Sequence, residues 1–255
     1  MTIAEKFAYV LRMMKEGDDE TAQAVADLPD FPRLSRLIEA HTLPSRSLLF
    51  GVASDGFPVV LNLLDPTPGP ILVIGDAGSG KTSFLRVAAQ SAVWSQSPRR
   101  VQFAVITATP EAWAGWDSVP HHLVTLSPYA AGIRDLLFDM AAWAQTDQRG
   151  QSRLFLIDDL SALLHLDAET LENLQWILTN GPNFGLWPIV TVNTLQAFNL
   201  PAWGQVFRTR VFGWIDRRED AYALAPASPA TDLLAGAQFC MRSRRGAWTR
   251  RGRRA

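Results

Sequence analysis

The sequence predicts an α/β fold in which a mainly parallel central sheet is flanked by helices. Short apolar runs rich in β-branched residues alternate along the chain with segments whose apolar residues recur at helical spacing. This alternation is typical of a parallel sheet that is covered on both faces. Three of the apolar runs end at Gly75, Asp158 and Asn193, and ligands of such sheets bind where the strands end. A binding site is therefore predicted at the carboxyl edge of the sheet.

Residues 1–44 are expected to form a small helical appendage. Thr2 and Glu5 fit a capping box, and an apolar stripe at helical spacing follows before Gly17. Two further short helices are expected up to Ala40. Stripes of this kind usually pack on a core or on another subunit, so no chemistry is assigned to this segment.

Strands and a phosphate-binding motif follow the appendage. Two apolar runs on either side of Asp55-Gly56 predict a β-hairpin, because Asp-Gly favours a two-residue turn. A buried strand is predicted over 70–75, and a helix is predicted from the end of the motif to Ser97-Pro98. The segment between them, Gly75–Thr82, fits G-x-x-x-x-G-K-[ST] at every fixed position. The alternative is a glycine-rich turn without a ligand, but the strand, loop and helix in this order favour a phosphate site.

The motif predicts ATP and Mg²⁺ as ligands. Its glycines allow a tight turn whose N–H groups face one anion at the N-terminus of the following helix. Lys81 is expected to reach the β and γ phosphates, and Thr82 is expected to place its hydroxyl on Mg²⁺. The residues assigned to nucleotide binding are Gly75, Asp76, Ala77, Gly78, Ser79, Gly80, Lys81, Thr82 and Ser83.

The remaining elements continue the alternation. Further strands are predicted over 101–107, 119–127, 154–158, 188–193 and 207–213, and helices over 131–143 and 168–180. Asp167 is expected to cap the second of these helices, and Asn180-Gly181 is expected to close it.

The segment Arg153–Asp159 has the form of a Walker B motif, an apolar strand that delivers a carboxylate to the edge of the sheet. Asp158 is expected to hold Mg²⁺ through water. Asp159 is the candidate catalytic base, since the second acid of such ATPases orients and polarises the attacking water. Aspartate is one methylene shorter than glutamate, and a displacement of about 1 Å can cost on the order of 10²-fold in rate. The alternative for Asp159 is a helix cap ahead of Ser161.

Three polar residues near the later strands are weighed as further catalytic groups. Asn193 carries an amide that can sense the γ-phosphate or hold the water, or it is an ordinary turn residue. Arg208 and Arg210 alternate with apolar residues, so both are expected on one face of a strand. One of them is a candidate to act across a subunit interface on the transferred phosphoryl group, and an exposed strand face explains them as well. The candidate catalytic residues are Lys81, Asp158, Asp159, Asn193 and Arg210.

Composition predicts a soluble protein that is retained in the cytoplasm. Of the 255 residues, 47% are hydrophobic and 19% are charged, which suffices for one domain with an appendage. No apolar run approaches a membrane span, and the N-terminus lacks the pattern of a secretory signal. The single cysteine, Cys240, excludes an internal disulfide and fits a buried strand residue better than a nucleophile. The four histidines show no ligand spacing, so no metal beyond Mg²⁺ is assigned.

The charges are distributed unevenly. Seven arginines lie between residues 242 and 254, and without them 17 basic residues face 25 acidic ones, a net charge of −8. An acidic body with a basic tail indicates that the tail meets a polyanion such as DNA or an acidic face of another subunit. The alternative is a solvated tail. The expected domain boundaries are 1–44 for the appendage, 45–241 for the ATPase domain and 242–255 for the tail.

Taken together, these segments resemble the FtsK/HerA branch of the RecA-like P-loop ATPases, which are ring-forming DNA-pumping motors. The resemblance covers roughly Leu48 to Phe239. Because the P-loop is shared more widely, the resemblance rests on the order of the later segments, Asn180–Asn193, Phe207–Gly213 and Leu233–Phe239. It implies a RecA-like P-loop NTPase fold and a homo-oligomer, a hexameric ring with nucleotide at the subunit interfaces and DNA in the pore.

Three residues depart from the pattern of this family. Asp159 stands where the family usually has glutamate, Asn193 stands for glutamine, and Pro182 occupies a position that is often arginine in the FtsK subgroup. The resemblance implies an ATP-hydrolysing motor domain that acts as a ring on DNA. An ATP-binding assembly or regulatory protein with little turnover, and a secretion motor of the same superfamily, remain as alternatives. A small-molecule kinase is disfavoured, because no lid-like arginine-rich segment precedes the tail.

Overall fold

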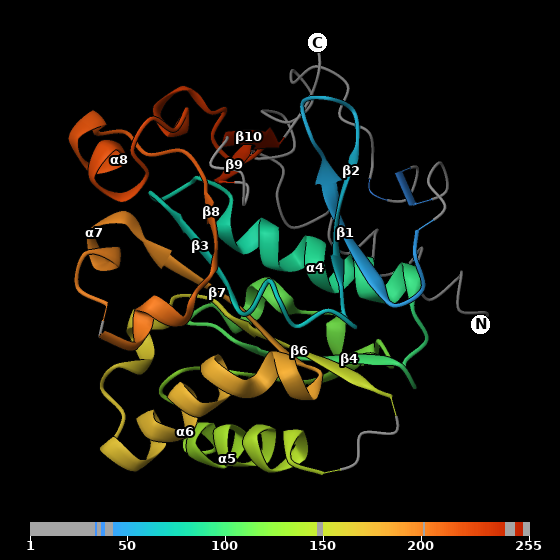
Figure 1. The fold of residues 1–255 in the computed structure, drawn as a ribbon. Helices are drawn as coiled ribbons and strands as arrows, with labels where there is room; N and C mark the ends of the chain where they lie inside the picture. The colour runs from blue at the N-terminus through green and yellow to red at the C-terminus, as the bar shows by residue number, and fades with distance from the viewer. Residues whose placement is uncertain are drawn as a thin grey trace.

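A computed structural model of the chain describes residues 34, 37, 38, 43–146, 150–200, 202–242 and 248–251. The helices expected over 1–44 therefore lie almost wholly outside the described residues. The rest of the chain forms one eight-stranded sheet, a separate hairpin and helices on both faces of the sheet (Figure 1). The predicted fold class is confirmed.

The central sheet is parallel over most of its width. The strand order is β10-β9-β8-β3-β7-β6-β4-β5, and β8 to β5 pair in parallel while β9 and β10 add antiparallel strands at one edge. The strands are β3 (Ile71–Gly75), β4 (Val101–Ile106), β5 (His122–Leu126), β6 (Ser152–Ile157), β7 (Leu186–Asn193), β8 (Thr209–Phe212), β9 (Phe239–Arg242) and β10 (Trp248–Arg251). Because β7 lies between β3 and β6, the ends of these three strands meet at one edge.

Alternate residues of each strand feed two cores, one on each face of the sheet. Ile71 and Val73 pack with α4 (Lys81–Ser95) and with the hairpin of β1 (Ser47–Val52) and β2 (Pro58–Asn62). Leu72 and Ile74 pack on the other face, which α5 (Ile133–Ala144) and α6 (Ala168–Asn180) cover (Figure 1). Every strand residue from Ile71 to Gly75 is buried, as expected of a strand covered on both faces.

Most of the predicted elements are present, with local differences at their ends. Asp167 caps α6 as predicted, its side chain accepting a hydrogen bond from the N–H of Thr170. The α-helix ends at Asn180 with Gly181 as its C-cap, as predicted, but the φ of Gly181 is −44° and a 3₁₀ helix continues to Phe184, so no left-handed turn forms at Gly181. The left-handed turn comes at Gly185, with φ of +75°.

Two differences arise from turns that periodicity does not register. The strand predicted over 119–127 begins only at His122, since a 3₁₀ helix over Trp116–Ser118 and a turn precede it. The short helices α7 (Thr194–Ala197) and α8 (Arg218–Leu224) were not predicted and follow β7 and β8. Cys240 is buried in β9, as predicted. No helix within the described ranges is long and apolar enough to cross a membrane.

Candidate functional site

The P-loop joins β3 to α4 with a backbone that requires glycine. Gly78 and Gly80 have φ of +76° and +90°, a conformation that side chains with a β carbon rarely adopt. A β carbon on Gly75 would lie 2.5 Å from Oγ of Ser79, and one on Gly80 would lie 2.9 Å from Cα of Gly236. The glycines of the motif therefore serve close backbone approach as well as the turn.

Residues that follow β8 form hydrogen bonds with the P-loop and pack against it. The N–H of Asp76 donates to the carbonyl of Trp214 at 3.0 Å, and Oδ2 of Asp76 accepts from the N–H of Asp216 at 2.8 Å. A β carbon on Gly213 would lie 3.1 Å from three atoms of Ser79. The shape of the P-loop therefore depends on a segment about 140 residues later in the chain.

The Lys81 ammonium group lies within the P-loop. It donates to the carbonyl oxygens of Gly75 and Asp76, at 3.0 and 2.8 Å. Burial lowers the pKa of Lys81, and the carboxylates of Asp158, Asp76 and Asp159 act in the opposite direction. No side chain caps the N-terminus of α4, so its first N–H groups and this ammonium offer positive charge at one place. The arrangement suits an anion such as a phosphate chain.

Asp158 follows β6 directly and accepts hydrogen bonds from two hydroxyl groups. Its Oδ2 accepts from Thr82 at 2.8 Å, and its Oδ1 accepts from Thr191 at 2.9 Å. The Thr191 hydroxyl, on the neighbouring strand β7, also accepts from the N–H of Asp159 at 2.8 Å. The two predicted metal ligands, Thr82 and Asp158, are thus brought together.

The Thr82 hydroxyl and the Asp158 carboxylate fit Mg²⁺, which takes one or two protein ligands and completes its shell with water and phosphate oxygens. A metal held mainly by the protein does not fit, because the described part of the chain contains no group of three or more His, Cys, Asp or Glu side chains that suits one. The donor set therefore suits a cation that binds together with a nucleotide.

The Asp159 carboxylate caps a short helix, which is the alternative that its sequence context allowed. Its Oδ1 accepts from the N–H of Ser161 at 3.0 Å and from the Ser161 hydroxyl, ahead of the 3₁₀ helix Leu160–Leu163. Its φ is +71°, which is uncommon for a residue with a β carbon. Within the described residues, no hydrogen bond to its Oδ2 is found.

Asn193 ends β7 level with the first residue of the P-loop, because its partner in the parallel pairing is Gly75. It precedes α7, but its side chain makes no capping hydrogen bond to that helix. The Asn193 amide is therefore placed at the same edge of the sheet as Lys81 and Asp158.

The two candidate arginines lie away from the P-loop of their own chain. Arg210 pairs with Leu72 in the parallel register of β8 and β3, three residues before Gly75. At about 3.3 Å per residue this separation is roughly 10 Å along the strand. The structure thus does not bring Arg210 to Lys81 and Asp158 within one chain.

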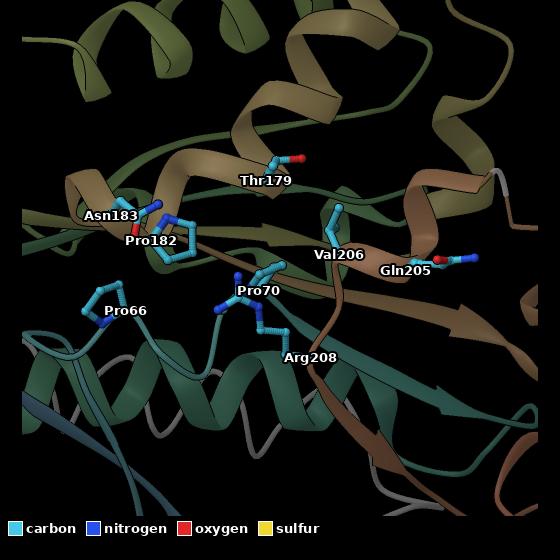
Figure 2. Close-up of a pocket in the computed structure, with 9 residues that line it drawn as sticks. Pro66, Pro70, Thr179, Pro182, Asn183, Gln205, Val206 and Arg208 are labelled. Atoms are coloured by element: carbon cyan, nitrogen blue, oxygen red, sulfur yellow. The ribbon is translucent and has the colours of Figure 1, made fainter. Parts of the chain in front are cut away.

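Arg208 lines a cavity of about 320 Å³ at the opposite edge of the sheet, where β3 and β8 begin. Figure 2 shows its side chain running alongside Pro70, with the guanidinium directed toward the side where Pro182 and Asn183 lie. Arg208 precedes β8, and Arg210 lines a separate cavity of about 180 Å³. The two arginines therefore do not share one site.

Sequence reasoning missed several residues that shape the site. The hydroxyl of Thr191 joins the two acids, Asp158 and Asp159. The sequence feature that could have identified Thr191 is a polar residue inside an apolar run, two positions before Asn193. The residues that contact the P-loop from the late segments are Gly213, Trp214, Asp216 and Gly236. The one sequence signal among them is Gly213, a glycine directly after a strand, which is too common a pattern to identify a contact.

Comparison with known proteins agrees with this geometry. Residues 41–155 match the model of the FtsK/SpoIIIE family. The fold is similar to that of Thermomonospora curvata EccC (ATPases 2 and 3), solved in complex with a signal sequence peptide, with a TM-score of 0.70 and 15% identity over 89% of this chain and 44% of that one. EssC (ATPases 2 and 3) from Geobacillus thermodenitrificans gives a TM-score of 0.70 and 13% identity over 88% of this chain and 47% of that one.

A viral protein with the same type of fold matches over its whole length. The genome packaging NTPase B204 of Sulfolobus turreted icosahedral virus 2, in complex with AMPPCP, gives a TM-score of 0.50 and 10% identity over 75% of this chain and 100% of that one. The present chain spans less than half of the EccC and EssC chains that it matches. The comparison with curated protein sequences finds no match. The resemblance predicted from the sequence is thus confirmed, and this chain has the fold of a P-loop ATPase with an FtsK/SpoIIIE match over residues 41–155.

Proposed function

We propose that this chain is an ATP-binding and ATP-hydrolysing motor domain of the FtsK type. The observation that carries the proposal is the convergence of Lys81, Thr82 and Asp158 at a P-loop between a buried strand and a helix. The amide of Asn193 and a second acid, Asp159, lie beside them at the same edge of the sheet. These are the parts that binding and cleavage of a nucleoside triphosphate require.

Each residue has a role in the proposed reaction. The P-loop N–H groups and Lys81 bind the phosphate chain, and Thr82 with Asp158 would hold Mg²⁺, which neutralises charge on the phosphates when it is bound. Asp159 accepts a proton from the attacking water or orients it, and Asn193 holds that water or contacts the γ-phosphate. For Asp159 to act so, its carboxylate must give up part of the cap on Ser161 or use its Oδ2.

An arginine in this scheme acts only on a neighbouring subunit. Arg210 is the sequence-based candidate, and its place roughly 10 Å from Gly75 along β8 is consistent with a role in trans. Arg208 is a second candidate, since its guanidinium is exposed beside Pro182, at the position where the FtsK subgroup often has arginine. Either role requires the homo-oligomer, such as a hexameric ring, that the family resemblance implies.

The polymer that is moved is proposed from charge and from the comparisons. Seven arginines near the C-terminus favour DNA, and one structural neighbour is a genome packaging NTPase. The second candidate is a protein substrate, which the likeness to EccC, solved with a signal sequence peptide, and to EssC favours. A cytoplasmic location fits either substrate.

A third candidate, an ATP-binding assembly protein with little turnover, is favoured by the engagement of Asp159 with Ser161. In this case ATP would hold subunits together. Asp159 and Pro182, which depart from the family pattern, would then account for the low turnover. Light scattering with and without ATP and Mg²⁺ measures this directly: an unchanged mass argues against it.

Phosphate release by the purified chain, with and without duplex DNA, tests the main proposal. We expect the turnover of the unaltered chain to exceed that of Lys81→Ala. The control Gly132→Ala should keep the turnover of the unaltered chain, because a β carbon on Gly132 meets only the tip of Leu126, at 3.8 Å. If the turnover of the unaltered chain equals that of Lys81→Ala under all conditions, the proposal of ATP hydrolysis is wrong. Stimulation by DNA supports a DNA motor, and activity that DNA leaves unchanged favours a protein substrate.

A further inference from the structure

A turn near the C-terminal end of the described chain, Leu234–Gln238, is closed by its own hydrogen bonds. The N–H of Leu234 donates to Oε1 of Gln238 at 3.1 Å. The N–H groups of Ala237 and Gln238 both donate to the carbonyl of Leu234, at 3.2 and 2.9 Å. Gly236, at the centre, has a φ of +76°. The turn is thus a defined structure that the Gln238 side chain completes.

This turn packs directly on the P-loop. A β carbon on Gly80 would lie 2.9 Å from Cα of Gly236, and one on Gly236 would lie 3.6 Å from the carbonyl oxygen of Gly78. Immediately after the turn, the ring of Phe239 packs edge-on against Phe84 in the first turns of α4, with centroids 5.3 Å apart. The Leu234–Gln238 turn therefore lies beside the P-loop and the beginning of α4.

The order of strands places this turn on the side of the nucleotide that carries the base. Asp158, which is expected to hold Mg²⁺, directly follows β6, and Asn193, which is expected near the γ-phosphate, ends β7; both strands lie on one side of β3. The turn leads into β9, on the other side of β3, beyond β8. A phosphate chain in the P-loop with its γ end toward Asp158 therefore directs its ribose and base toward the turn.

The surface at that position is open and partly apolar. Leu234, two residues before Gly236 in the same turn, is 39% exposed, and Ser83, the last residue assigned to nucleotide binding, is exposed in the first turn of α4. An apolar side chain next to a polar phosphate site suits the flat face of a nucleobase. Glycine fits position 236 because its φ of +76° is one that residues with a β carbon rarely adopt.

We propose that the Leu234–Gln238 turn is the wall of the nucleotide site that receives the ribose and the base, with Leu234 packing on the base and Gln238 holding the turn in shape. The inference rests on the proposed binding of ATP at the P-loop. It assigns to the closing segment of the domain a contact with the nucleoside, and the P-loop keeps the contact with the phosphates.

The test compares ATP with tripolyphosphate, which has the phosphates but neither ribose nor base. Displacement of a fluorescent ATP analogue gives the Kd of each ligand for the full chain in the presence of Mg²⁺. Leu234→Ala and Gln238→Ala are expected to raise the Kd of ATP by about five- to tenfold and to leave that of tripolyphosphate within about twofold. The matched control is Leu64→Ala, another exposed leucine, which lies just after β2.

The possible outcomes separate this proposal from the one on which it rests. An equal loss of affinity for both ligands shows that the turn only supports the P-loop, and an unchanged Kd of ATP shows that it makes no contact; either result overturns the inference. If the unaltered chain binds ATP no better than Lys81→Ala does, the proposed function itself fails. Thermal unfolding of each variant shows whether a loss of affinity comes from a loss of fold.

Discussion

The two edges of the central sheet differ in how firmly their residues are held. At the carboxyl edge, Asp158 accepts two hydroxyl hydrogen bonds, Asp76 is bound by two backbone groups, and glycines are required by close backbone approach. At the amino edge, Arg208 extends into an open cavity beside Pro182, and no ion pair to it is found among the described residues. One edge is a preformed site, and the other is an open surface.

This difference indicates which kind of molecule each edge binds. Groups that are pinned by their own chain are ready for a small ligand, because no further ordering is needed when it binds. An exposed arginine that forms no ion pair with the described residues is available for contact with another molecule. Substitutions at the carboxyl edge should therefore affect an isolated subunit, and those at the amino edge should matter only in an assembly.

The largest effect is expected from Asp158→Asn. The amide keeps hydrogen bonding with Thr82 and Thr191 but removes the negative charge that would hold the cation. Turnover should fall by about 10²- to 10³-fold, while the free energy of unfolding changes by less than about 1 kcal/mol. Phosphate release and urea unfolding measure the two quantities. Asp55→Asn is the control, since Asn-Gly also forms a good turn at the tip of the hairpin. A decrease in turnover of less than tenfold for Asp158→Asn would contradict the role assigned to Asp158.

Gly75→Ala should have the next largest effect. Its β carbon would meet Oγ of Ser79 at 2.5 Å, so the P-loop must shift. Hydrogen bonds to charged groups contribute about 1.5–3 kcal/mol each, so the loss of one or two contacts between the P-loop and the phosphates should raise the Kd of ATP by about 10²-fold. Equilibrium binding measures it, with Gly132→Ala as the control that should stay within about twofold. Equal affinities for the two variants would show that the P-loop adapts without loss.

Thr191→Val should have an intermediate effect on turnover, because the Thr191 hydroxyl bonds to both acids. The substitution keeps the volume but leaves Oδ1 of Asp158 and the N–H of Asp159 without their shared partner. The free energy of unfolding should fall by about 1–3 kcal/mol, and turnover should drop by roughly tenfold. Thr191→Ser should restore turnover.

Thr209→Val serves as the matched control for that substitution. It removes a hydroxyl that bonds to the Pro68 carbonyl at 2.8 Å, far from the two acids along the sheet. It should reduce stability without reducing turnover per folded molecule. If Thr191→Val behaves in the same way, Thr191 is a structural residue alone.

The sequence was sufficient for most of the strands and long helices and for the part of the site that lies within one contiguous segment, but not for the short helices α7 and α8. The P-loop, its flanking strand and helix, and the Walker B strand each depend on neighbours in sequence, so their patterns predicted them. Thr191 and Gly236 could not be predicted in the same way. Their contacts with Asp158 and Gly80 arise only when strands and turns distant in sequence are placed side by side.

Asp159 shows a different limit of sequence reasoning. The sequence around Asp159 fits a catalytic carboxylate and a helix cap equally well. Ser161, two residues later, can donate the hydrogen bonds of a cap whether or not Asp159 also takes part in catalysis. The structure adds that the cap is formed through Oδ1, and that the backbone takes an uncommon positive φ of +71° at this residue. Position alone could not distinguish the two roles, since both place the Asp159 carboxylate two residues after the end of β6.

The smallest effect on an isolated subunit is expected at the amino edge, from Arg208→Ala and Arg210→Ala. Neither side chain lies near the P-loop of its own chain, so the Kd of ATP should stay within about twofold of that of the unaltered chain. If an arginine acts in trans, turnover per subunit of the unaltered chain should rise with protein concentration as subunits assemble. The variant that loses this rise, measured as phosphate release across a dilution series, identifies the arginine that acts. A variant that weakens ATP binding in dilute, unassembled protein would contradict the separation of the two edges, because it would require Arg208 or Arg210 to reach the nucleotide within one chain.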